Sequence, residues 1–258
     1  MLLKNLFLLK RSFPRLFNLF YWVTIELLFW GFITLWFRSF LSGNQGVDLV
    51  IALLTGLIFW DMFLRSQHSL TISFLEDVWS RNLINIFASP LGLSELVISL
   101  VLLSIIQVLI AFFYVSLLAF LLYSLKIWAV GFYIIPFFLN IFLFGWALGL
   151  FTVGIIIRFG PSAEILAWSI PFLLLPFSAV YYPLSILPAV VQKIAFFLPT
   201  MHLFEGMRAV LINNNFPVND LFWATILNIV YFSLGVLFLY LMLRTAKKKG
   251  LIARLLTD

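Results

Sequence analysis

Long runs of apolar residues dominate the sequence, and they limit what the chain can fold into. A run of about 20 apolar residues forms a helix long enough to cross about 30 Å of hydrocarbon. Six such runs lie at residues 20–37, 47–64, 94–123, 127–157, 163–180 and 221–243. Backbone polar groups must be satisfied inside a bilayer, and these runs do not alternate in polarity as barrel strands do. The sequence therefore predicts an all-α integral membrane protein with six transmembrane helices.

Composition supports the same class of protein. Hydrophobic residues make up 64% of the chain and charged residues 10%, whereas about 25% of a soluble protein is charged. No linker or internal repeat divides the sequence, so we expect one transmembrane domain over residues 1–258. The chain has no cysteine, which excludes a disulfide framework, a thiolate metal site and a cysteine nucleophile.

The distribution of basic residues predicts the orientation. In a six-span arrangement most of the 16 Lys and Arg residues share one side with both termini, and the other side carries Arg38, Lys126, Lys193 and Arg208. Basic loops face the cytoplasm, so we expect a multi-pass protein of the cytoplasmic (inner) membrane with both termini in the cytoplasm. The net charge of +6 then reflects topology and attraction to anionic membrane lipid rather than nucleic-acid binding.

Basic residues interrupt the apolar residues at the start of the sequence. Lys4, Arg11 and Arg15 recur on one helical face, which predicts an interfacial helix over residues 1–19. A basic flank that only sets topology is the alternative. A signal peptide is not indicated, because basic residues interrupt the apolar positions and no small-residue cleavage site follows.

A charged segment, "SFLEDVWSRNLINIFASP" at residues 73–90, separates the second and third apolar runs. Ser73 and Glu76 form an S-x-x-E capping box that predicts a helix start, and Pro90 favours its end. Asp77 and Arg81 fall on one face of this helix. An apolar stripe on another face contains Leu75, Trp79, Leu83 and Ile86. The pattern predicts a short cytoplasmic amphipathic helix over residues 73–89, which either anchors the bundle at the interface or docks a partner.

Prolines divide the region between the fifth and sixth runs. Pro183, Pro188 and Pro199 leave apolar pieces too short to span a bilayer, which predicts a re-entrant outer hairpin over residues 181–218. An ordinary surface loop is the alternative. Tyr181 and Tyr182 fit either membrane-interface anchors or a pathway lining.

Acidic residues within or beside the apolar runs are candidate functional positions. Glu26 is the one that lies plainly inside a run, either facing a pathway or near the interface. Asp61 precedes Arg65 by four residues, the spacing of a local ion pair. Glu95 lies at a helix start, where negative charge is favoured, and Glu205 and Arg208 have the spacing of a second ion pair.

Two stretches of the chain resemble the ABC-2 type transporter permeases. "FLEDVWSRNLINIFASPLGLSELV" is similar to the segment between the second and third helices of that family. "LPFSAVYYPLSILPAVVQKIAFFLPTMHLFEGMRAVL" resembles its proline-rich region before the last helix. The two stretches occur in the family's order, and the likeness extends over essentially the whole chain.

The resemblance implies an assembly and roles for residues. Two permease copies, as a homodimer or related heterodimer, would sit on two copies of a separate ABC ATP-binding subunit and export a polysaccharide, lipid-linked or drug-like substrate. Residues 1–19 would be the family's interfacial elbow. Coupling to the ATP-binding subunit would involve Glu76, Asp77, Trp79, Arg81 and Asn82. The translocation pathway or outer gate would involve Glu26, Tyr181, Tyr182, Pro183, Pro188, Pro199 and Arg208.

Enzymatic chemistry is not indicated by the sequence. There is no G-x-x-x-x-G-K-[ST] loop, so ATP and Mg would be held by the partner subunit, and we expect no cofactor in this chain. His68 and His202 are far apart, which argues against a metal cluster or a catalytic triad. A secondary transporter and a structural membrane subunit that transports nothing are the alternatives to a permease.

Overall fold

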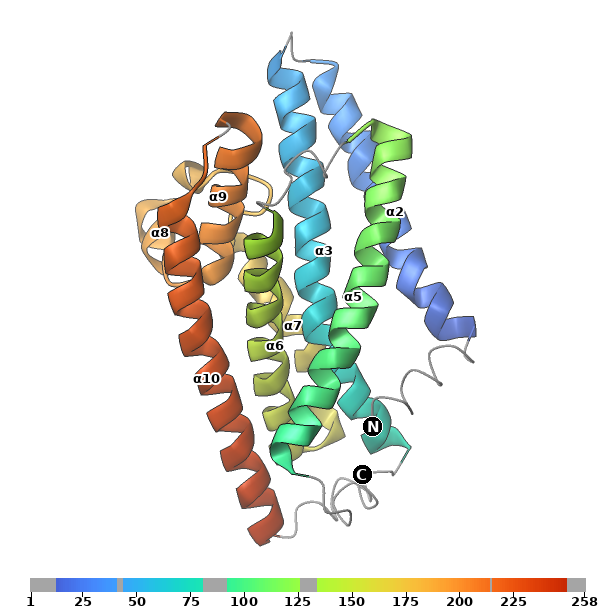
Figure 1. Ribbon diagram of the computed structural model, residues 1–258, viewed down its shortest axis with the longest axis vertical. Coiled ribbons are helices and arrows are strands. Elements are labelled where there is room, and N and C mark those ends of the chain that lie inside the picture. The colour runs from blue at the N-terminus through green and yellow to red at the C-terminus, as the bar shows by residue number, and fades with distance from the viewer. Residues whose placement is uncertain (1–12, 41–43, 81–91, 126–133, 214, 250–258) are drawn as a thin grey trace.

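The computed structural model describes residues 13–40, 44–80, 92–125, 134–213 and 215–249, and within these ranges the chain forms helices and no strand. The long helices lie side by side in one bundle (Figure 1). Their order along the chain is α2 (Phe13–Arg38), α3 (Asn44–Trp79), α5 (Leu93–Tyr123), α6 (Ile134–Phe159) and α10 (Val218–Lys249). Shorter helices come between α6 and α10: η2 (Pro161–Glu164), α7 (Ile165–Leu174), η3 (Leu175–Phe177), η4 (Leu184–Ile186), α8 (Ala189–Ala195) and α9 (Pro199–Asn213).

Five helices in the described ranges are long and apolar enough to cross a membrane. Their candidate spans are Phe20–Arg38, Val50–Trp79, Ser94–Tyr123, Ile134–Phe159 and Val218–Lys248. Each overlaps an apolar run identified in the sequence. The chain is therefore an all-α membrane protein with several long membrane-type helices, as predicted.

Helix α3 lies at the centre of the bundle. It packs against α6, α5, α2 and α9, and 78% of its apolar window is buried. The outer helices instead expose large apolar side chains, such as Trp22, Phe29 and Phe32 on α2, each at least 58% exposed. Such outward faces suit a hydrocarbon surrounding, because in lipid apolar surface carries no hydration cost.

The predicted helix start at Ser73 is wrong. Helix α3 continues without a break from Asn44 to Trp79, and Ser73 is a buried residue inside it. An S-x-x-E motif caps a helix only where the preceding chain leaves the helical conformation. No Gly or Pro lies between Leu64 and Ser73 to end the helix, so the second run and the first part of the 73–89 segment form one long element.

The predicted fifth span at residues 163–180 coincides with an apolar helix over Ser162–Phe177, which is shorter than the five candidate spans, so a sixth span stays a prediction. Beyond it, Ser178 Oγ and Thr200 Oγ1 are hydrogen-bonded at 2.7 Å, which places the end of η3 against the start of α9. The chain between them forms η4 and α8, and α8 meets α9 at a bend of 100°.

The N-terminal prediction falls largely outside the described residues. Residues 1–12, including Lys4 and Arg11, lie beyond them, whereas residues 13–19 belong to α2 and continue into the first span. The boundary expected at residue 19 is therefore absent, because no helix-breaking residue separates the two parts.

Candidate functional site

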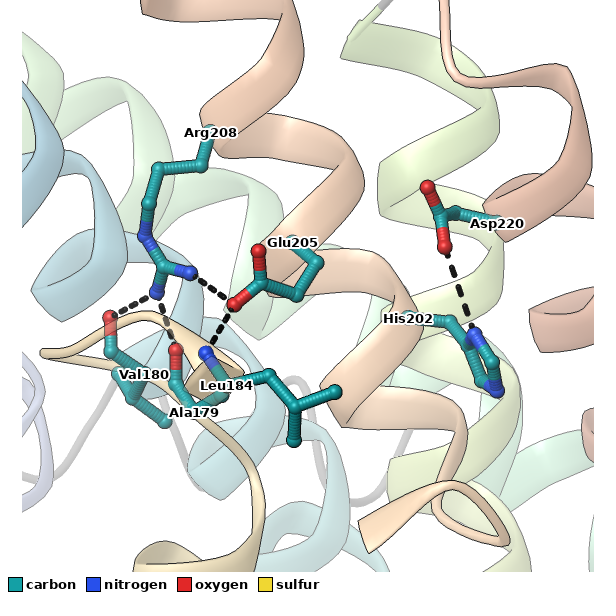
Figure 2. Close-up of polar contacts among 7 residues, drawn as sticks. All are labelled: Ala179, Val180, Leu184, His202, Glu205, Arg208 and Asp220. Carbon is teal, nitrogen blue, oxygen red and sulfur yellow. Dashed lines mark hydrogen bonds and ion pairs between the residues drawn. The ribbon is translucent and has the colours of Figure 1, made fainter. Parts of the chain in front are cut away.

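The segment of residues 178–184, which we name the tyrosine loop, is held by two side chains of α9. Arg208 Nη2 donates to the carbonyl oxygens of Ala179 and of Val180, the latter at 3.4 Å. Arg208 Nη1 donates to Glu205 Oε1 at 2.6 Å, and the same carboxylate oxygen accepts the backbone N–H of Leu184 at 2.6 Å (Figure 2). The predicted Glu205–Arg208 ion pair is thus confirmed, and it also fixes the loop.

The conformation of the tyrosine loop explains why it needs these partners. Ala179 has a φ of 52°, which is uncommon for a residue with a side chain. Ser178, Ala179 and Val180 are all buried, and a buried carbonyl without a hydrogen bond costs free energy. Arg208 supplies donors in a fixed planar arrangement that can serve two carbonyl groups at once. Arg208 is therefore a positioning residue for the loop.

Helices α3 and α2 close the other sides of the tyrosine loop. A Cβ added to Gly56 on α3 would lie 2.7 Å from the carbonyl oxygen of Val180, so only glycine permits this approach. On α2, the ring of Trp30 stacks on that of Tyr181 with centroids 4.8 Å apart and an interplanar angle of 19°. The loop thus connects helices α2, α3 and α9.

Charged groups gather beside this loop. Asp61 accepts a hydrogen bond from Arg65 Nε at 2.6 Å, which confirms the predicted local pair. Glu26, a half-buried residue of α2, is within electrostatic reach of both Asp61 and Arg65, and Tyr181 is within reach of the Glu26 and Asp61 carboxyl groups. The structure therefore brings together Glu26 and Tyr181, two residues that the sequence nominated separately.

The three prolines nominated as gate residues each begin a short helix. Pro183 precedes η4, Pro188 precedes α8, and Pro199 is the first residue of α9. At Pro199 the fixed φ of proline matches the first helical turn. Pro183 and Pro188 are N-cap residues with extended backbone, with ψ of 150° and 147°, and at all three positions the missing N–H has no helical partner. Tyr182 is half-buried, and its hydroxyl donates to the Pro176 carbonyl at 2.7 Å.

Helix α9 is also attached to α10. His202 is buried, its Nδ1 lies 3.5 Å from Asp220 Oδ1, and its Nε2 lies 2.9 Å from the Phe196 carbonyl (Figure 2). His68 lies elsewhere, on α3, with Nε2 3.1 Å from the Ala167 carbonyl. Within the described ranges, no group of three His, Asp or Glu side chains is arranged to hold a metal ion.

The nominated coupling residues fall at the C-terminal end of α3 and just beyond it. Glu76 is half-buried, Asp77 is 2% exposed and Trp79 is 56% exposed. The Asp77 side of the helix therefore faces the bundle, beside Phe74, Leu75 and Val78, whereas Trp79 of the predicted apolar stripe is exposed. Arg81 and Asn82 lie outside the described residues.

Two polar contacts in the bundle interior were not predicted. Asn228 Nδ2 on α10 donates to Asn140 of α6, to its Oδ1 and to its backbone carbonyl, both at 2.9 Å. Trp146 Nε1 donates to Ser104 Oγ at 3.0 Å, and that hydroxyl donates to the Ser66 carbonyl at 3.3 Å. A single amide inside an otherwise apolar run was the available signal for the first contact.

Comparisons with known proteins do not assign a family. No protein-family model matches the chain, and no curated protein matches it. The likeness to the ABC-2 permeases thus rests on the two stretches of sequence quoted above.

Proposed function

We propose that this chain is the transmembrane permease subunit of an ATP-driven ABC exporter. It would move a polysaccharide, lipid-linked or drug-like substrate outward across the cytoplasmic membrane, with both termini in the cytoplasm. Two copies of a separate ATP-binding subunit would hold and hydrolyse ATP with Mg, and a second permease copy would complete the pathway.

One observation carries the proposal: the bent α8–α9 pair between α7 and the last long helix. The two helices meet at 100°, each begins at or directly after a proline, and they lie in the stretch that resembles the family's proline-rich region. Short helices broken in this way suit a hairpin that enters the bilayer and turns back, since neighbouring side chains satisfy the backbone groups. Arg208 and Glu205 provide such contacts for the tyrosine loop.

The length of α3 supports a role in coupling. Its 36 residues extend about 54 Å at 1.5 Å per residue, well beyond the roughly 30 Å of a hydrocarbon core. In the proposed orientation the C-terminal end projects into the cytoplasm and presents Trp79. A rigid helix of this kind transmits a push from a cytoplasmic subunit to Gly56 and the tyrosine loop.

A secondary transporter is the second candidate, and the charged groups at Glu26, Asp61 and Arg65 favour it. Buried ionisable residues in membrane helices are often sites of ion coupling. In the permease these groups would instead line the pathway beside Tyr181. A subunit that transports nothing is the remaining alternative.

Co-purification tests the proposal. The tagged full-length chain is co-expressed with candidate ABC ATP-binding subunits of the same organism and isolated in lipid nanodiscs. We expect the two subunits to co-elute in equal amounts. Failure to associate, together with ATP-independent uptake driven by an ion gradient in proteoliposomes, would support the secondary transporter instead.

A further inference from the structure

Helices α6 and α10 pack against each other more extensively than any other pair of described elements, and Figure 1 shows them side by side. An apolar groove of about 430 Å³ lies between them. Its walls include Leu148 and Phe151 of α6 and Leu234, Phe238 and Leu241 of α10. Leu234 and Leu241 are 55% and 43% exposed, so the groove opens toward the outside of the bundle.

The groove results from an uneven approach of the two helices. A Cβ added to Gly235 would lie 2.7 Å from the Ala147 carbonyl oxygen, so the backbones are in close contact there. Beside that contact, Phe151 and Phe238 are paired with ring centroids 4.6 Å apart and form part of the wall. The groove lies beside this close backbone contact, and the side chains that line it leave it open.

Basic residues follow the groove at one end. Gly154 of α6 faces Phe238 and Leu239 of α10, so the chain beyond Gly154 runs beside the chain beyond Leu239. Arg158 lies two helical turns after Phe151, and Arg244 lies one turn after Leu241. Neither arginine forms an ion pair within the described ranges, and Arg244 is exposed.

We propose that this groove binds one acyl chain of an anionic phospholipid, whose phosphate group binds Arg158 and Arg244. The lining from Tyr231 to Leu241 extends about 15 Å along α10, which is half of a hydrocarbon core of about 30 Å. That is the depth reached by an acyl chain of one leaflet. The apolar wall accepts any acyl chain, whereas the two guanidinium groups select an anionic headgroup.

The occupant is a lipid rather than a free phosphate or a second protein chain. A free phosphate would use the arginines without the apolar wall. A second copy of this chain would cover the outward-facing Leu234 and Leu241 with protein and exclude a photoreactive lipid from the groove, an outcome that the labelling described below detects. The site needs no ATP-binding subunit, so its test is independent of the proposed function.

Photolabelling tests the proposal in the full-length protein. Phosphatidylglycerol with a diazirine in its acyl chain is added to phosphatidylcholine nanodiscs, and labelled residues are mapped by mass spectrometry. We expect labelling at the groove residues of α6 and α10, in preference to phosphatidylcholine with the same photoreactive chain. Replacing Arg158→Gln and Arg244→Gln should lower that preference about fivefold for each arginine. The charge-conserving pair Arg158→Lys and Arg244→Lys should retain most of it.

A second pair of variants tests the groove itself. Leu234→Trp places a large ring in the furrow and should reduce labelling several-fold, whereas Ile229→Trp, on the same helix and 58% exposed outside the groove, should not. Size-exclusion profiles verify that each variant is folded. The proposal would be overturned if the two lipids labelled the groove equally. It would also be overturned if added inorganic phosphate abolished the labelling, or if Leu234→Trp had no effect on it.

Discussion

Arg208 and Glu205 form an ion pair of 2.6 Å within α9, and both side chains also bind the backbone of the tyrosine loop. A pair confined to one exposed helix would contribute little to stability. Here Arg208 is 14% exposed and serves buried carbonyl groups as well. The ion pair therefore acts both within α9 and on the tyrosine loop, which lies more than 20 residues earlier in the chain.

Replacing Arg208→Gln should destabilise the protein by about 2 kcal/mol, because buried carbonyls and a carboxylate lose their donor. Arg208→Lys should recover part of the loss, since an ammonium group keeps the charge but not the planar fork. The measurement is the unfolding free energy in detergent. Lys193→Gln, an exposed change on α8, is the control; equal effects of Arg208→Gln and Lys193→Gln would contradict the assignment.

Gly56→Ala should displace the tyrosine loop and destabilise the protein by about 1–3 kcal/mol, the usual cost of overpacking. The added methyl group would meet the Val180 carbonyl oxygen, which is backbone and cannot move alone. Gly92→Ala is the comparison without a steric clash, because its Cβ would meet nothing closer than 3.7 Å and any loss there reflects only the N-cap position of Gly92 on α5. A thermal unfolding midpoint that falls no further for Gly56→Ala than for Gly92→Ala speaks against the close approach.

Trp30 and Tyr181 should show a coupling energy of about 1 kcal/mol in a double-mutant cycle with alanine, as stacked aromatic rings do. Tyr181→Phe keeps the ring and should leave the coupling unchanged. If Tyr181→Phe nevertheless lowers transport, the hydroxyl group acts in the pathway rather than in packing. Additive effects of the two alanine changes would show that the rings do not interact.

Asn228→Leu should cost about 1 kcal/mol, typical of a hydrogen bond between membrane helices. It leaves Asn140 Oδ1 and a backbone carbonyl without the donors they now have. The double change Asn140→Leu with Asn228→Leu should restore part of the loss, because both polar partners are then removed. Unfolding in detergent measures both variants, and a double variant less stable than the sum of the singles would be the contrary outcome.

Local contacts could be predicted from the sequence. The Asp61–Arg65 and Glu205–Arg208 pairs follow from helical spacing alone, and the five long helices follow from apolar runs. The helix start predicted at Ser73 was wrong, because the capping motif lies inside a helix that no Gly or Pro interrupts. The hydrogen bond from Arg208 to the Ala179 carbonyl could not be predicted from the sequence, because it depends on how α9 folds back on η3. Asn140 and Asn228 are each a polar residue in an apolar run, but nothing in the sequence shows that the two side chains lie at the same depth on facing helices.

We propose that an ATP-binding subunit acts on this chain through the end of α3. The most direct measurement is the ATP hydrolysis rate of the co-purified complex in nanodiscs, with Trp79→Ala compared with Trp36→Ala. The two tryptophans are 56% and 60% exposed, and Trp36 lies toward the other end of the bundle. Exposed tryptophans are frequent interface anchors, so we predict that Trp79→Ala slows hydrolysis or weakens association about tenfold while Trp36→Ala does neither. A hydrolysis rate that is the same with and without this chain, and the same for both variants, would contradict the account.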